Sequence, residues 1–289
     1  MTEVLMPVTA RTVAIPLTEA DIPQLRLPGR RSNEQTRDTL RSWPGRSVWV
    51  PGTLEHLLIG SWRNRREISS IEEISAVRHL PALVEQAIAQ CNHHGDELLL
   101  ALELESHRGR SRFERAGLEQ LEEVITYEID TMRVPVLQEH GLRATEAYRE
   151  DNALLLQLLA LDNAAFPWLW RNSLEEFWEY LGSPGVQVLA IHDRNALAAY
   201  IGVTAFEGWG HIDRVAVQPE RQGEGLGAVA VALGLDMLRR GGARRVGLST
   251  QRSNVRSQRL YERLGFQRTP ELDYHLYGAP TGASAIAAR

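Results

Sequence analysis

The stretch that decides the fold covers residues 211–227 and reads HIDRVAVQPERQGEGLG. Its first part, residues 211–217, is an apolar stretch that predicts a β-strand. Gly223, Gly225 and Gly227 then occupy every second position, and the apolar run AVAVAL that follows them predicts a helix. Glycine costs about 0.5–1 kcal/mol relative to alanine inside regular structure. Three of them at the start of a helix therefore indicate that something must approach the backbone closely at this turn.

Backbone N–H groups at the first turn of a helix have no partner within the helix, and the helix dipole favours an anion beside them. A pyrophosphate suits such a nest, because several donors can reach its oxygens. Taken alone, the glycines are explained equally well by a tight strand-to-helix turn without a ligand. The stretch matches neither the Walker phosphate loop, which needs Gly-Lys-Ser/Thr, nor the dinucleotide fingerprint G-x-G-x-x-G.

The elements around this stretch predict an α/β fold with a mixed, mostly antiparallel sheet flanked by helices. Consecutive hairpins make one half antiparallel, whereas the strand–helix–strand step over 211–250 requires a parallel neighbour and a right-handed crossover. The expected helices cover residues 150–161, 173–181, 223–240 and 253–264. The expected strands cover residues 186–192, 196–206, 211–217, 245–250 and 271–277.

Two motifs together resemble the GNAT family of acyl-coenzyme A N-acyltransferases. That family has a loop Gln/Arg-x-x-Gly-x-Gly/Ala after a strand ending in Val-x-Pro, and here Val217-Gln-Pro219 precedes Gln222-Gly-Glu-Gly-Leu-Gly227. Its later helix carries an Asn, a Tyr seven residues on and then Gly-Phe, which here are Asn254, Tyr261 and Gly265-Phe266. The resemblance covers roughly residues 142–278 and implies the acyl-CoA N-acyltransferase fold.

The resemblance implies acetyl-CoA as the co-substrate and no metal ion. The pyrophosphate would rest on the N–H groups from Gln222 to Ala228, and the pantetheine arm would run beside the strand that ends at Val217. A backbone N–H of that strand would polarise the thioester carbonyl. The expected cofactor-binding residues are Val215, Val217, Gln222, Gly223, Glu224, Gly225, Gly227, Ala228, Asn254 and Ser257.

The catalytic residues implied by the resemblance are Tyr261, His211 and Asp213. Tyr261 occupies the position of the family's usual general acid, which protonates the departing sulfur. Strand alternation is expected to place both His211 and Asp213 on the face that also carries Val215 and Val217. His211 is the candidate base because histidine titrates near neutral pH, and Asp213 is either the alternative base or the group that orients it. Three alternatives stay open, namely a core role for Tyr261, a turn role for His211 and an ordered water as the proton relay.

The implied reaction is N-acetylation of a primary amine by direct attack in a ternary complex, and the acceptor is expected to be a small molecule. Aromatic residues over 166–170 and 177–178, together with Trp209, either hold an amine by stacking and cation–π contacts or pack the core. A protein N-terminus or lysine is an alternative acceptor. A non-catalytic CoA-binding regulator and a two-lobed scaffold are alternative functions.

The N-terminal half contains an echo of this domain. Residues 111–118, SRFERAGL, align with residues 259–266, RLYERLGF, and upstream LLLALE at 98–103 aligns with the strand at 246–251. A helix is expected over residues 80–94, and with one inserted residue Tyr127 matches Tyr274. Such agreement in order predicts an internal repeat.

The residues that the resemblance links to catalysis and cofactor binding are missing from this copy. Phe113 replaces Tyr261, Ser106 replaces Asn254, and the segment 62–73, taken as the counterpart of the glycine loop, has no glycine. We therefore expect a degenerate acyltransferase-like lobe at 1–138, an acetyl-CoA-binding domain at 139–279 and a flexible tail at 280–289.

Composition sets the outer limits. A hydrophobic content of 43% and a charged content of 24% are typical of a soluble globular protein, and the net charge of −5 gives no support to nucleic-acid binding. No apolar run reaches the roughly 20 residues of a membrane span, and no signal peptide is recognised. The single cysteine, Cys91, fits a cytoplasmic protein. All 32 basic residues are arginine, so no lysine is present to act as a base, and a homodimer stays open.

Overall fold

The structure is a computed structural model that describes residues 13–25, 27, 31–104, 111–131 and 141–282. The chain forms two compact units, one made of residues up to Leu121 and from Leu276 onward, and one made of Glu122–His275. These limits differ from the predicted 1–138 and 139–279. Within the described residues, no helix is long and apolar enough to cross a membrane.

The first unit is a sheet with the strand order β1-β2-β3-β4-β5-β13. Strands β3 and β4 form an antiparallel hairpin, and β4 pairs with β5 in parallel across the helix α2. The strands are β1 Ile15–Pro16, β2 Val48–Trp49, β3 His56–Trp62, β4 Arg65–Ser75, β5 Leu98–Leu104 and β13 Tyr274–Pro280. The helices are η1 Glu19–Gln24, α1 Asn33–Ser42, α2 Leu80–His93 and α3 Arg112–Arg115.

The second unit is a sheet with the order β6-β11-β10-β9-β8-β7, and β12 pairs with β6. The pair β10–β11 is parallel, whereas β6–β11, β9–β10, β8–β9 and β7–β8 are antiparallel. The strands are β6 Glu119–Asp130, β7 Arg143–Ala147, β8 Val186–Asp193, β9 Ala196–Phe206, β10 Trp209–Val217, β11 Arg245–Gln251 and β12 Gln267–Arg268. The helices are α4 Asn152–Ala165, η3 Trp168–Trp170, α5 Leu174–Gly182, η4 Pro219–Arg221, α6 Leu226–Arg240, α7 Val255–Arg263 and η5 Pro270–Leu272.

Helices cover both faces of the second sheet, and each face has its own core. Helix α6 packs with residues such as Ile212 and Val246 on one face. Helices α4 and α5 pack with Val188, Tyr200 and Ala216 on the other. The predicted α/β class with a mixed, mostly antiparallel sheet flanked by helices is thereby confirmed.

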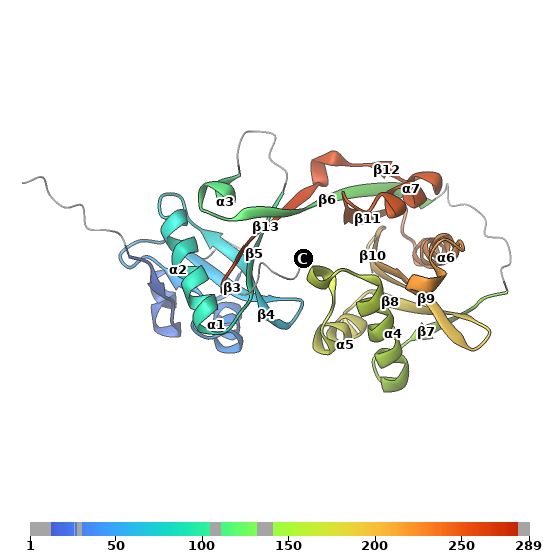
Figure 1. The fold of residues 1–289 in the computed structure, drawn as a ribbon, viewed down its shortest axis with the longest axis horizontal. Helices are drawn as coiled ribbons and strands as arrows, with labels where there is room; N and C mark the ends of the chain where they lie inside the picture. The colour runs from blue at the N-terminus through green and yellow to red at the C-terminus, as the bar shows by residue number, and fades with distance from the viewer. Residues whose placement is uncertain (1–12, 26, 28–30, 105–110, 132–140, 283–289) are drawn as a thin grey trace, which may run out of the picture. The chain divides into compact units, whose positions relative to one another are not determined.

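One strand in each unit comes from a distant part of the sequence. Figure 1 shows β6, in green, beside the orange and red elements of the second unit, and the red β13 beside the blue and cyan elements of the first. Ile125, Tyr127 and Ile129 of β6 are buried in the α6 core, and Tyr277 and Ala279 of β13 are buried in the core under α2. These buried side chains make each strand part of the unit that it joins.

The C-terminal end of β13 corrects the expected start of the tail. The strand continues to Pro280, and the N–H of Thr281 donates to the Glu97 carbonyl at 3.1 Å. Residues 283–289, the rest of the predicted tail, lie outside the described residues, as does most of the expected junction near 130–141.

The two units share the predicted repeat. The order β4-α2-β5-α3 in the first unit matches β10-α6-β11-α7 in the second. The short helix ends in a left-handed glycine in both copies, Gly117 with φ +100° and Gly265 with φ +95°. In both copies, the aromatic residue of this helix packs on the strand that comes from a distant part of the sequence. The ring centroids are 5.9 Å apart for Phe113 and Tyr277 of β13, and 6.1 Å apart for Tyr261 and Tyr127 of β6.

The predicted counterpart of the glycine loop in the first unit was misplaced. The segment 62–73 is the β3–β4 turn followed by most of β4, because Arg63 and Asn64 adopt positive φ values of 56° and 49° and reverse the chain. The residues that enter α2 are instead 76–79, Ala-Val-Arg-His. This segment also contains no glycine, so the absence of a glycine loop from this lobe stands.

A carboxylate of the protein occupies the entrance to α2. Glu55 accepts hydrogen bonds from the N–H groups of Arg78, at 3.1 Å, and His79, at 2.8 Å. Burial opposes ionisation of Glu55, but the backbone donors His79, Arg78 and Val77 outweigh it and lower the pKa of its carboxyl. These N–H groups at the start of α2 are therefore satisfied from within the chain.

We expect Glu55→Gln to lower the free energy of unfolding by about 1 kcal/mol at neutral pH, as the loss of a helix cap does. The folded pKa lies below the unfolded value, so the stabilisation is present above the unfolded pKa and is lost as the pH falls through the folded pKa. Urea unfolding at neutral pH measures the loss of stability, and urea unfolding in acid measures how that loss depends on pH. Glu207→Gln, at an exposed turn, is the control, and an acid-insensitive difference would contradict the assignment.

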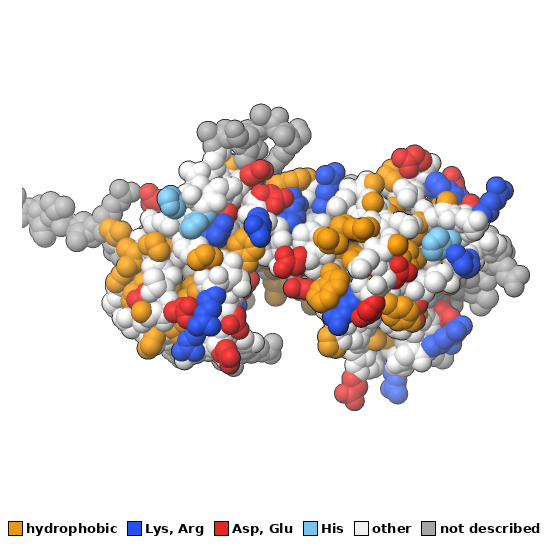
Figure 2. All heavy atoms as spheres, turned by 90° about the horizontal axis from the view of Figure 1, so that it is seen from below, with side chains coloured by type: hydrophobic (Ala, Val, Ile, Leu, Met, Phe, Trp, Pro, Cys, Tyr) orange, Lys and Arg blue, Asp and Glu red, His pale blue; other side chains and the backbone are white. Residues whose placement is uncertain are grey.

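The charges on the face drawn in Figure 2 are mixed. Arginine side chains and acidic side chains alternate over this face of each unit, with apolar side chains between them. No broad basic surface is visible on the described residues of this face.

Candidate active site

The site begins where two strands separate. Strands β10 and β11 pair in parallel from Trp209↔Arg245 to Ile212↔Leu248. Beyond that point β10 stays paired with β9 as far as Val217, and β11 with β6 as far as Gln251. Beyond Ile212 and Leu248, the facing edges of the two strands are not paired with each other in the described residues. These edges belong to residues 213–217 of β10 and 249–251 of β11.

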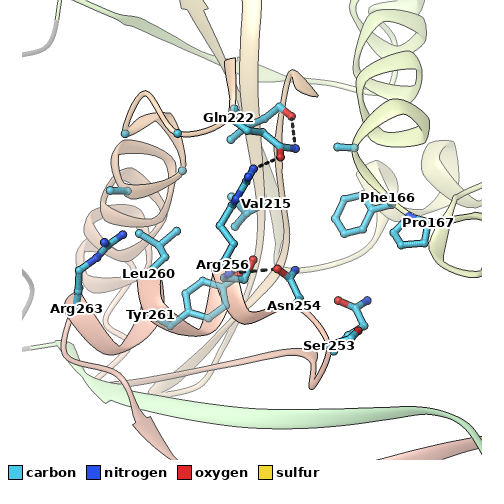
Figure 3. A pocket seen from close by; sticks show the side chains of 18 of the residues that line it. Phe166, Pro167, Val215, Gln222, Ser253, Asn254, Arg256, Leu260, Tyr261 and Arg263 are labelled. Atoms are coloured by element: carbon cyan, nitrogen blue, oxygen red, sulfur yellow. Dashed lines mark hydrogen bonds between the residues drawn. The ribbon is translucent and has the colours of Figure 1, made fainter. Parts of the chain in front are cut away.

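A pocket of about 580 Å³ lies at this opening, within the size range of small-molecule sites. Figure 3 shows the side chains of α7 on one side of it, Phe166 and Pro167 on another, and Val215 and Gln222 between them. The structure brings together in its wall the predicted residues Val215, Val217, Gln222, Gly223, Gly225, Gly227, Ala228, Asn254, Ser257 and Tyr261.

The glycine loop, residues 222–228, presents bare backbone to the pocket. Gly223 and Gly225 have φ values of +100° and +88°, a region that side chains rarely adopt. Among the described residues, the N–H groups of Gly223, Gly225, Leu226 and Gly227 donate to no carbonyl, whereas those of Gln222, Glu224 and Ala228 do. The group of free donors is therefore narrower than the predicted run from Gln222 to Ala228.

Glu224 is the one predicted cofactor residue that does not line the pocket. Its carboxylate accepts hydrogen bonds from Arg221 at 2.9 and 2.8 Å and is half exposed. Arg221 also pairs with Asp193 at 3.0 Å. The ion pair with Arg221 holds the Glu224 side chain at the surface. The predicted cofactor-binding role of Glu224 is therefore not supported by a contact of its side chain with the pocket.

Two arginines of α7 were missed by sequence reasoning. Arg256 and Arg263 line the pocket with Leu260 between them, and Arg256 hydrogen-bonds to the Gln222 side-chain oxygen. Gln222 in turn donates to the Val217 carbonyl at 3.4 Å. Their seven-residue spacing places both arginines on one helix face, which is the signal that was available. Together with the start of α6, they make this end of the pocket attractive to anions.

Tyr261 is buried in the pocket wall and 7% exposed. Its ring packs against Tyr127 and Phe266. Burial raises the pKa of the Tyr261 hydroxyl to about 12, although a hydrogen bond with Ser257 acts in the opposite direction. The hydroxyl is thus protonated at neutral pH and can donate a proton.

Asn254 has a structural duty in addition to its place in the pocket. Its side-chain oxygen accepts from the Ser257 N–H at 3.2 Å and caps helix α7. The side-chain NH₂ group is the part of Asn254 that is left to contact a ligand.

A β-bulge overturns the predicted strand alternation. The register between β10 and β9 shifts between Ile212 and Arg214, so that Asp213 is the extra residue. Val215 and Val217 pack on the α6 side with Ile212, whereas Asp213 contacts Tyr180 of α5. His211 and Asp213 therefore do not share a face with the two valines, and neither lines the pocket.

His211 and Asp213 belong to a separate polar cluster. One Asp213 oxygen lies 2.7 Å from His211 Nδ1, and the other accepts from the hydroxyls of Tyr180 at 2.7 Å and Thr204 at 2.6 Å. Burial, with the adjacent Asp213 charge, holds the pKa of Tyr180 well above its usual value, so Tyr180 is the donor. Asp213 is engaged on both oxygens and can orient His211, whose role as base stays a prediction.

The predicted aromatic residues separate into several groups. Phe166 lines the pocket, whereas Phe177 is fully buried in the α4–α5 core. Trp178 is 44% exposed with Arg149 over its ring, and Trp209 packs beside His211. Among these, Phe166 is the residue placed to contact a pocket ligand.

A buried ion pair fixes the wall that carries Phe166. Arg214 donates to both oxygens of Asp162 at 2.7 and 2.9 Å and to the Trp170 carbonyl at 2.9 Å. Its guanidinium also lies 3.9 Å from the centre of the Phe166 ring. The sequence analysis did not find this pair, because nothing local marks Asp162 or Arg214 as buried.

Within the described residues, no group of His, Cys, Asp and Glu side chains is arranged to hold a metal ion.

The second unit thus combines a glycine loop, two parallel strands that separate and a buried tyrosine in the wall of one pocket. Residues 155–266 match the model of the Acetyltransferase (GNAT) family. The match covers the part of the chain that carries the glycine loop and Tyr261.

The chain is also similar to two curated proteins that are described as N-acetyltransferases. The chain is 30% identical over 91 residues to a proposed [ribosomal protein bS18]-alanine N-acetyltransferase of Bacillus subtilis, covering 32% of this chain and 60% of that protein. It is 26% identical over 136 residues to the uncharacterized N-acetyltransferase YobR of the same organism, covering 40% and 55%. The chain thus spans less than two thirds of each of these relatives.

Solved structures show the same fold over nearly the whole chain. A tandem GNAT protein from the clavulanic acid biosynthesis pathway has a TM-score of 0.59 at 17% identity, covering 94% of this chain and 99% of that one. A GCN5-related N-acetyltransferase from Anabaena variabilis has a TM-score of 0.62 at 13% identity, covering 93% and 72%. The tandem arrangement is therefore an architecture that this chain shares.

Proposed function

We propose that the protein transfers an acetyl group from acetyl-CoA to a primary amine by direct attack within a ternary complex. The match of residues 155–266 to the acetyltransferase family model supports this activity, and the donor and the mechanism are also part of the proposal. The observation that carries it is a single pocket that joins a glycine loop with free N–H groups to a buried, protonated tyrosine.

The donor is expected to use both ends of the pocket. The N–H groups of Gly223, Gly225 and Gly227, with Arg256 and Arg263 nearby, suit a pyrophosphate. The open edge of β10 beyond Ile212 suits the pantetheine arm, whose amides can pair with an unpaired strand edge.

The proposed reaction needs one bond made and one bond broken. The amine nitrogen attacks the thioester carbonyl carbon, the C–S bond breaks, and the nitrogen loses a proton while the sulfur gains one. An N–H of the open β10 edge stabilises the oxyanion, and Tyr261 supplies the proton to sulfur. Because His211 does not line the pocket, a water molecule would receive the proton of the amine and pass it to solvent or to His211, which Asp213 orients.

The burial of the chain's single cysteine and the raised pKa of its thiol favour direct attack over an acyl-enzyme intermediate. Cys91 is buried in the core of the first unit, and burial raises the pKa of its thiol to about 12. It lines no part of the pocket and is not a thiolate at neutral pH, so it does not serve as an acyl carrier.

The first unit is proposed to shape the protein rather than to catalyse a second reaction. Glu55 occupies the helix entrance where the second unit keeps free N–H groups. Phe113, which has no hydroxyl, is the counterpart of Tyr261 and is fully buried.

A protein N-terminal amine is the second candidate acceptor. It is favoured by the relative of 30% identity, which is proposed to acetylate an alanine of a ribosomal protein. A regulatory protein that binds CoA without turnover is the alternative from another class.

The test measures release of free thiol from acetyl-CoA with a panel of small amines and short peptides, beside calorimetric titration of acetyl-CoA. Thiol release that depends on an amine supports the proposal, and the preferred acceptor separates the two candidates. Binding without turnover against the panel would favour the regulator. No binding of acetyl-CoA would overturn the proposal.

A further inference from the structure

One carboxylate stands in the wall of the pocket. Glu122 is the single acidic residue among the described residues that line it, and Arg256 and Arg263 are the basic ones. It comes from β6, which lies outside the residues matched by the family model. The residue therefore belongs to the site only because β6 joins the second unit.

Neutral donors hold the Glu122 side chain in place. One carboxylate oxygen accepts from the Trp170 indole N–H at 3.3 Å, and the other from the Ser253 hydroxyl at 3.3 Å. A carboxylate offers about four acceptor sites, so these two bonds leave others free.

Glu122 also differs from its neighbour on the strand. Glu123 pairs with Arg252 at 2.5 Å, whereas no ion pair joins Glu122 to an arginine in the part of the chain that the structure describes. Phe166 and Pro167 line the same pocket, and Glu122 itself is partly buried, so its charge is less screened than at an open surface. The carboxylate has the surroundings of a cation-binding group.

We propose that Glu122 binds a cationic group of the acceptor, and that the acceptor is a primary amine carrying a second positive charge. This inference rests on the proposed function. The bound cation is not the attacking amine, because a carboxylate in contact favours the protonated form, which has no lone pair for attack. Glu122 is therefore a specificity residue that holds the far end of a diamine or of a basic side chain.

The probes are butane-1,4-diamine and butylamine, which share a chain length and differ by one ammonium group. We expect the CoA-saturated protein to bind the diamine, and Glu122→Gln to raise the Kd for the diamine about tenfold or more. The Kd for butylamine and that for acetyl-CoA should stay unchanged. In the thiol-release assay, the same variant should raise KM for the diamine with little change in kcat.

Glu123→Gln is the matched control, since it removes a neighbouring carboxylate of the same strand that is paired with Arg252. It should leave binding of the diamine unchanged. Equal binding of the two amines to the wild-type protein, no binding of the diamine, or a diamine Kd unaffected by Glu122→Gln would each overturn the inference. Diamine binding that depends on Glu122, without thiol release, would support it and count against the proposed function alone.

Discussion

Tyr261→Phe is expected to lower turnover by about 10²-fold or more, with the Kd for acetyl-CoA unchanged. The substitution removes the Tyr261 hydroxyl, which is the proposed proton donor, and keeps the ring that packs on Tyr127 and Phe266. Steady-state thiol release gives kcat, and calorimetric titration gives the Kd. Turnover equal to wild type would remove Tyr261 from the acid role and leave it a core aromatic.

Tyr127→Phe is the matched control, because Tyr127 is a buried tyrosine in the same core that does not line the pocket. It should leave turnover unchanged. Since burial raises the pKa of Tyr261 to about 12, the hydroxyl stays protonated across the neutral range. The pH profile of the remaining activity in Tyr261→Phe should therefore keep the wild-type shape between about pH 6 and 9. An acidic or alkaline limb lost with the hydroxyl would show that Tyr261 titrates within this range.

Gly225→Val is expected to weaken binding of acetyl-CoA by about 100-fold or more, which corresponds to about 2.7 kcal/mol. Gly225 caps α6 with φ +88°, and a Cβ there meets nothing within 4 Å. The loss therefore comes from two sources, a side chain forced into the left-handed region and a branched group that stands in front of the free N–H donors. Calorimetric titration with acetyl-CoA measures the Kd.

Gly242→Val separates these two sources. Gly242 also has a left-handed φ of +90°, and a Cβ at this position would likewise meet nothing within 4 Å, but the residue lies beyond the C-terminal end of α6, away from the pocket. The substitution should cost similar stability and leave the Kd unchanged. Equal losses of affinity in both variants would mean that backbone strain alone explains the effect, and an unaltered Kd in Gly225→Val would count against the site.

The two motifs that carry the family resemblance were enough to predict most of the pocket. The glycines, Asn254 and Tyr261 lie within a strand, a loop and two helices whose internal geometry is fixed by short-range hydrogen bonds, so their positions follow once the elements are recognised. The N-cap of α5 is also local, because the Ser173 side chain accepts from the Glu176 N–H at 3.0 Å. The repeat was also readable, because the glycine that ends a short helix and the aromatic residue within it recur in order.

Features that depend on a partner strand could not be predicted from the sequence. The bulge at Asp213 arises from the register between β10 and β9, and a single strand carries no sign of that register. Glu122 was missed for the same reason, since the pattern of β6 predicts a strand but not the sheet that it joins. Arg214 and Asp162 were missed because a buried ion pair is defined by two elements that meet only in the folded chain.

The reciprocal placement of β6 and β13 has a consequence for biosynthesis. As the polypeptide leaves the ribosome, β6 emerges before the rest of the second unit and is available when β11 arrives to pair with it. The first unit can complete its sheet and core only later, because Tyr277 and Ala279 of β13 are translated after nearly all of the second unit. Until then the nascent lobe exposes an open sheet edge, the kind of surface that invites mispairing and chaperone capture. The half of the protein that is made first is therefore the half that matures last.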